Sequence, residues 1–131
     1  MKTRKTRYSV YNLNYHLVWI PKYRKPILVG KIAQGLKELF QTSAKPEDVE
    51  LLAIKVMPDH IHLFVSAPPR YSPAKLVNIF KGVSSRRLRE KYSGLKQKIP
   101  KRLWTRTYYA GTAGTVTLET IKKYIKKQKE I

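Results

Sequence analysis

The sequence has 131 residues, of which 28 are Lys or Arg and 8 are Asp or Glu, and its formal net charge is +20 at pH 7. This length suits one domain over residues 1–131 and excludes large multidomain enzymes, while 42% hydrophobic residues exclude a fully disordered chain. Because the chain has no cysteine, it has no disulfide, thiolate zinc site or cysteine nucleophile.

The first half of the chain predicts a strand, a helix and a pair of strands. Residues 8–20 are rich in β-branched, aromatic and apolar types and end at a proline, which predicts a strand. Residues 27–41 carry apolar side chains at helical spacing and predict a helix. Residues 49–56 and 60–67 lie on either side of the turn Met57-Pro58-Asp59 and predict two paired strands.

The second half predicts a helix, a strand and a terminal helix. Ser72 and Pro73 supply an N-cap and a first-turn proline for a helix that runs to about residue 92. Residues 103–109 predict the last strand, and the glycine-containing residues 110–114 predict a linker. Thr117 is a suitable N-cap for a final helix that carries five lysines.

This βαββαβ order with an added helix predicts an α+β fold. The split βαβ plan, called ferredoxin-like or RRM-like, is an antiparallel sheet with helices on one face. Neither an internal repeat nor a low-complexity segment interrupts the order. We therefore expect one sandwich domain followed by a C-terminal helix.

The positive charge is concentrated in three segments. Residues 1–37 hold nine basic residues and no acidic one, residues 81–106 hold ten against Glu90 alone, and five lysines follow Thr120. A charge surplus of this size destabilises a fold by self-repulsion unless a polyanion neutralises it, so nucleic acid is the expected partner. Aromatic residues such as Tyr23 lie among these charges, where they would stack on unpaired bases or pack in the core.

A membrane partner is disfavoured. The basic N-terminus is not followed by an apolar signal core, and the sequence contains no apolar stretch of about 18 residues. No long amphipathic helix offers a broad apolar face to a lipid surface. We expect a soluble cytoplasmic protein.

A pair of histidines is the first candidate site. In a strand over residues 60–67, His60 and His62 point to one face while Ile61, Leu63 and Val65 point to the other. Side chains two apart lie roughly 6.6 Å apart along the strand, so both imidazoles can reach one metal ion. The alternative is a pair of hydrogen-bonding histidines on a half-buried strand.

The donor inventory limits what a metal at this pair could do. Asp59, if it lies in the preceding turn, would accept a hydrogen bond from an imidazole. A zinc hydrolase needs further His and Asp ligands, and only His16 remains, which disfavours that class. Two nitrogens therefore need an oxygen ligand from elsewhere in the chain or from the substrate.

The terminal helix carries the second candidate site. Tyr124 and Gln128 are four residues apart, so they share one helix face at the edge of its apolar stripe. The plain interpretation is that Tyr124 packs at the border of the core and Gln128 is a solvated surface residue. Alternatively, a tyrosine hydroxyl attacks a metal-bound phosphate, and Gln128 supplies the missing oxygen ligand.

Five ordered motifs resemble one enzyme family. The segment Pro58-Asp59-His60-Ile61-His62-Leu63 is similar to the His-hydrophobe-His motif of the HUH nucleases. The chain as a whole resembles the single-tyrosine transposases of small insertion sequences that move as single-stranded DNA, often called TnpA. The other matching segments are Tyr15-His16-Leu17-Val18-Trp19 with Pro21-Lys22-Tyr23-Arg24, Lys81-Gly82 with Ser85, Leu103-Trp104, and Tyr124-Ile125-Lys126-Lys127-Gln128.

The resemblance implies roles for particular residues. Tyr124 matches the nucleophile that forms a 5′-phosphotyrosine and frees a 3′-hydroxyl. His60, His62 and Gln128 match the ligands of Mg²⁺ or Mn²⁺. His16 matches a recurrent position, for which we expect a structural role.

The resemblance also implies a homodimer whose active sites can be shared between subunits, with Gly111 and Gly114 in a flexible tether to the tyrosine helix. The expected function is a DNA transposase that cuts and rejoins single-stranded DNA at hairpin-marked element ends by metal-assisted transesterification. The alternatives are a domesticated HUH hairpin endonuclease and a non-catalytic single-stranded nucleic-acid-binding module. Eight carboxylates show no acidic triad for a two-metal nuclease, which favours tyrosine chemistry.

Overall fold

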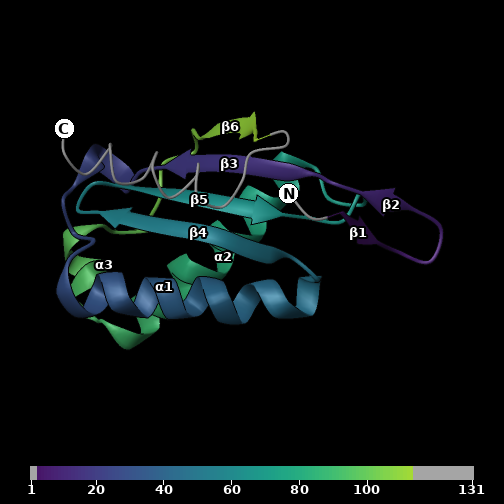
Figure 1. Ribbon diagram of the computed structural model, residues 1–131. Coiled ribbons are helices and arrows are strands. Elements are labelled where there is room, and N and C mark those ends of the chain that lie inside the picture. The colour runs from purple at the N-terminus through teal and green to yellow at the C-terminus, as the bar shows by residue number, and fades with distance from the viewer. Residues whose placement is uncertain (1–2, 114–131) are drawn as a thin grey trace.

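The structure is a computed structural model that describes residues 3–113 (Figure 1). A four-stranded sheet has the strand order β4-β5-β3-β6, and every neighbouring pair is antiparallel. The helices lie on one side of this sheet (Figure 1). The elements are β1 (Arg4–Lys5), β2 (Val10–Tyr11), β3 (Asn14–Trp19), η1 (Lys22–Arg24), α1 (Gly30–Ala44), η2 (Lys45–Glu47), β4 (Glu50–Met57), β5 (His60–Ser66), α2 (Pro73–Lys91), α3 (Gly94–Lys98) and β6 (Tyr109–Thr112).

The core lies between the sheet and the helices, as the alternation in β5 predicts. Ile61, Leu63 and Val65 are fully buried in the same cluster as Leu36 of α1 and Phe80 of α2. The intervening side chains of β5 therefore point to the face away from the helices. The predicted α+β class with helices on one face of an antiparallel sheet is confirmed.

Helix boundaries differ slightly from those that periodicity predicts. Ser72 caps α2 as expected, because its Oγ accepts the backbone N–H of Lys75 at 3.1 Å. The first helix begins at Gly30 instead of residue 27, since the N–H of Leu28 donates to the carbonyl of Pro58 at 3.0 Å and holds that segment extended. No helix among residues 3–113 has the length and apolar character needed to cross a membrane.

The predicted N-terminal strand over residues 8–20 is divided. β1 and β2 form a small separate hairpin that projects from the body, and only β3 joins the main sheet (Figure 1). Arg4 anchors the hairpin by donating from Nη1 to the carbonyl of Ser66 at 3.0 Å and from Nη2 to the carbonyl of Asp48 at 2.8 Å. This anchor is a long-range contact, which local composition does not encode.

The prediction of a strand over residues 103–109 followed by a linker is wrong. Trp104 makes a single bridge to Pro21, and the edge strand β6 covers Tyr109–Thr112. Gly111, expected in a flexible tether, lies opposite His16 in this strand. The ring of Tyr109 lies over Gly111, and a Cβ added at Gly111 would collide with the tyrosine hydroxyl. A glycine at this position therefore leaves room for the ring.

Candidate metal-binding and active site

The two histidines of β5 lie side by side on the sheet face away from the helices. His60 is opposite Met57, and His62 lies between Lys55 of β4 and Val18 of β3. The His60 and His62 ring centroids are 5.1 Å apart. The predicted shared face is confirmed, and it places two imidazoles where one ligand can meet both.

His16 joins this pair from the neighbouring strand. Its Nε2 lies 2.9 Å from Nδ1 of His62, within hydrogen-bond distance. Its ring stacks on Phe64, with centroids 4.2 Å apart and an angle of 7° between the planes. Sequence reasoning assigned His16 a structural role only, because the β3–β5 register that brings it to His62 is a long-range feature. The signals in the sequence were that His16 is the remaining histidine of three, lies in a predicted strand and matches a recurrent position of the family that the chain resembles.

Asp59 orients the other histidine. It lies in the turn before β5, and its Oδ1 accepts a hydrogen bond from Nδ1 of His60 at 2.8 Å. Arg24 donates from Nε to the second carboxylate oxygen at 2.9 Å. The hydrogen bond from His60, opposed by partial burial and assisted by Arg24, lowers the pKa of Asp59. The carboxylate therefore stays ionised and keeps the imidazole in one orientation, as expected for a residue in the turn.

Both His62 and His16 are neutral at physiological pH. Burial, with smaller contributions from His16, His60 and Lys55, lowers the pKa of His62 to about 4. Burial also lowers the pKa of His16. A metal binds the neutral form of imidazole, so the environment of His62 favours a ligand over a protonated side chain.

The donor set fits a divalent metal but is incomplete within the described residues. Nδ1 of each β5 histidine is in a hydrogen bond, so Nε2 is the nitrogen that a metal would take. Across residues 3–113, no three His, Cys, Asp or Glu side chains converge where they could hold an ion. At least one oxygen ligand must come from elsewhere or from a substrate. Gln128 and Tyr124 lie outside the described residues.

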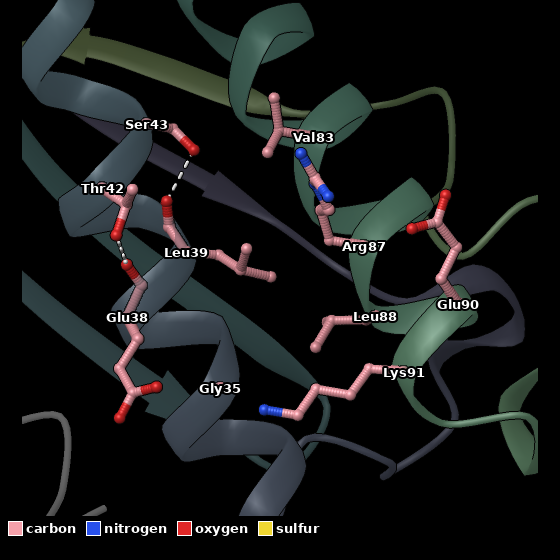
Figure 2. A pocket seen from close by; sticks show the side chains of 10 residues that line it. All are labelled: Gly35, Glu38, Leu39, Thr42, Ser43, Val83, Arg87, Leu88, Glu90 and Lys91. Atoms are coloured by element: carbon pink, nitrogen blue, oxygen red, sulfur yellow. Dashed lines mark hydrogen bonds between the residues drawn. The ribbon is translucent and has the colours of Figure 1, made fainter.

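A hollow lies away from this site, between α1 and α2 (Figure 2). It has a volume of about 610 Å³, and its charged residues are Glu38, Glu90, Arg87 and Lys91. The hydroxyls of Thr42 and Ser43 donate to backbone carbonyls of their own helix (Figure 2). This mixed-charge hollow has no histidine, and nothing in it parallels the chemistry of the β5 pair.

Comparison with known families links the chain to transposases. The profile of the family described as "Transposase IS200 like" matches residues 9–128. The ISDra2 transposase TnpA of Deinococcus radiodurans is 40% identical over 129 residues, which cover 98% of this chain and 92% of that protein. A transposase for insertion sequence element IS200 from Salmonella typhimurium is 34% identical over 121 residues, covering 92% and 79%.

Solved structures share the fold. A crystal structure of a Deinococcus radiodurans protein assigned as a transposase superposes with a TM-score of 0.78 at 37% identity, covering 95% of this chain and 97% of that one. The structure of a REP-associated tyrosine transposase bound to a REP hairpin superposes with a TM-score of 0.58 at 14% identity, covering 95% and 68%. At that low identity, the second likeness concerns the fold alone.

Proposed function

Because the chain belongs to the family of IS200-like transposases, we propose that it cuts and rejoins single-stranded DNA at hairpin-marked element ends through a 5′-phosphotyrosine intermediate. The observation that carries this proposal is the pair of β5 imidazoles, each oriented by a hydrogen bond at Nδ1. The REP hairpin bound by a tyrosine transposase of the same fold supports the choice of hairpin DNA as partner.

The proposed site combines two parts of the chain. His60, His62 and Gln128 hold Mg²⁺ or Mn²⁺, which when bound polarises the scissile phosphate. Tyr124 is the nucleophile, on a helix that completes the site within a homodimer. Among the described residues, Asp59 and His16 keep the two imidazoles in place.

The proposed chemistry conserves the energy of the cut bond. The Tyr124 oxygen forms a bond to phosphorus as the bond from phosphorus to the 3′ oxygen breaks, and the departing oxygen takes up a proton as a free 3′-hydroxyl. A 3′-hydroxyl of another strand then reverses the step and displaces the tyrosine. Neither water nor an external energy source is consumed. The basic segments hold both ends by their phosphates until they are joined.

The proposal predicts a covalent protein–DNA product. Incubation of the protein with Mn²⁺ and a labelled single-stranded oligonucleotide carrying an element-end hairpin should give an adduct that survives detergent. No adduct should form when EDTA is present from the start. Addition of a second strand with a 3′-hydroxyl should convert the adduct to joined DNA. An adduct without joined product would support the hairpin endonuclease instead, and no adduct with any element end would refute the catalytic proposal.

The hydrogen bond between His16 and His62 predicts that substitution of His16 weakens metal binding. With a metal on Nε2 of His62, Nδ1 carries the proton and donates it to Nε2 of His16. His16→Phe keeps the ring on Phe64 but removes the acceptor, so Mn²⁺ should bind roughly 10- to 100-fold more weakly. His16→Gln keeps an acceptor oxygen and should lose less. Titration of the DNA-free proteins, followed by the Mn²⁺ paramagnetic resonance signal, measures both, and equal affinities in all three proteins would contradict the role.

A further inference from the structure

A basic surface lies beside η1. Two adjoining hollows of about 590 and 340 Å³ share Arg102, Trp104, Thr105 and Arg106. We call them together the η1 groove, and none of the described residues that line it is acidic. Its defining side chains are Lys22, Tyr23, Lys81, Lys101, Arg102 and Arg106. A groove with this charge favours a polyanion.

One wall of the groove offers an exposed aromatic face. Tyr23 is 69% exposed, and the Lys22 ammonium lies 5.3 Å from its ring centroid. An exposed ring beside a cation is the arrangement on which unpaired bases stack while their phosphates meet the cation. A duplex keeps its bases stacked on one another, so this wall favours a single strand.

The backbone that presents Tyr23 is held in an uncommon conformation. Tyr23 and Arg24 have φ values of 63° and 50°, and Lys101, across the same groove, has 71°. These are three of the four non-glycine residues with positive φ among residues 3–113. Bulky residues adopt the left-handed region only where surrounding contacts hold them there, and such positions cluster at functional sites.

Specific contacts fix the opposite wall. The N–H of Lys22 donates to the carbonyl of Leu103 at 2.8 Å, and the N–H of Thr105 donates to the carbonyl of Ile20 at 3.1 Å. Lys81 of α2 donates from Nζ to the carbonyl of Thr105 at 2.7 Å and so ties the segment around Thr105 to α2. The exposed side chains of Arg102 and Arg106 are therefore presented on a fixed segment, ready to meet phosphates.

The same turn connects the groove to the histidines. Arg24, next to Tyr23, donates to Asp59, and Asp59 accepts from His60. Tyr23 is therefore one residue along the chain from the ion pair that orients the His60 imidazole.

We propose that the η1 groove holds the single-stranded DNA segment next to the scissile phosphate, with an unpaired base stacked on Tyr23 and backbone phosphates on Lys22, Arg102 and Arg106. The inference rests on the proposed function for the identity of its ligand. The groove thus identifies which of the chain's many basic residues contact this DNA segment, and how they do so.

Binding of a single-stranded oligonucleotide by the Tyr124→Phe protein in EDTA tests the stacking contact without chemistry or metal. Tyr23→Ala in this background should weaken binding roughly 5- to 150-fold, while Tyr23→Phe, which keeps the ring, should bind like the parent. With Tyr23→Trp, the fluorescence of the new indole should be quenched by the single strand and much less by a duplex, because only the single strand has unpaired bases. The native Trp19 and Trp104 are only 1% and 4% exposed, so the new indole is the one that the DNA can reach. Equal affinity of Tyr23→Ala and the parent, or equal quenching by duplex, would overturn the stacking contact.

A matched pair of double variants tests the phosphate contacts. Arg102→Ala with Arg106→Ala should make the slope of log affinity against log salt shallower by about 1.4, the value for two phosphates of a single strand. Arg70→Ala with Lys75→Ala removes the same charge from exposed positions outside the three basic segments and outside the groove, and it should leave the slope unchanged. Equal slopes for the two double variants would refute the placement of the single-stranded DNA in the η1 groove. Groove binding without a DNA adduct would refute the catalytic proposal alone, whereas an adduct with unaffected groove variants would refute the groove alone.

Discussion

Tyr124→Phe is expected to abolish the covalent DNA adduct completely. The phenylalanine ring lacks the hydroxyl oxygen that forms the bond to phosphorus, so no phosphotyrosine can form. Affinity for single-stranded DNA should stay unchanged, because the basic segments that neutralise phosphates are intact. The measurement is the fraction of labelled oligonucleotide retained on the protein after denaturation, with the modified peptide identified by mass spectrometry.

Tyr109 is the matched control for this variant. It is exposed, it lies on the same sheet face as the histidines, and its ring centroid is 5.5 Å from that of His16. Among the described tyrosines, it is therefore the competing nucleophile that geometry suggests. Tyr109→Phe should keep the adduct. If Tyr109→Phe abolished the adduct and Tyr124→Phe retained it, the assignment of Tyr124 would be wrong.

Loss of either β5 histidine is expected to lower the rate of adduct formation by roughly a hundredfold or more, since Lewis-acid stabilisation of a phosphoryl transition state contributes several kcal/mol. His60→Ala and His62→Ala should also lose measurable Mn²⁺ binding in the absence of DNA. DNA affinity in EDTA should change little. The measurements are single-turnover kinetics and the Mn²⁺ titration described for His16.

A neighbouring substitution separates loss of metal from loss of fold. Val18 lies directly opposite His62 on β3, on the same sheet face, and has no side-chain donor for a metal. Val18→Ala should therefore keep both Mn²⁺ binding and adduct formation while perturbing the packing around His62. If the histidine variants formed the adduct at the parental rate with Mn²⁺ present, the β5 pair would not be the metal site.

Local pattern was sufficient for much of the fold. The alternation of Ile61, Leu63 and Val65 with the two histidines correctly separated a core face from a polar face, because a strand has a period of two. The capping signal at Ser72 correctly placed the start of α2. These features depend on residues close together in the chain, where spacing alone determines which side chains share a face.

Pairing between distant segments was beyond the reach of local pattern. β6 lies at Tyr109–Thr112 because its backbone pairs with β3, although the glycine there favoured a linker and residues 103–109 had the better strand composition. The η1 turn, with left-handed φ at Tyr23 and Arg24, carries no glycine signal at those positions. Contacts with Leu103 and Asp59 maintain it.

By itself, the sequence determined the charge, the α+β class and the shared face of His60 and His62, since composition and strand periodicity are local properties. The tertiary structure decided which groups surround that pair. The β3–β5 register brings His16 to His62, and η1 brings Arg24 to Asp59, the turn residue whose hydrogen bond with an imidazole the sequence had predicted. The physical reason is that strand register and turn contacts join residues tens of positions apart, through hydrogen bonds that no short window of sequence contains.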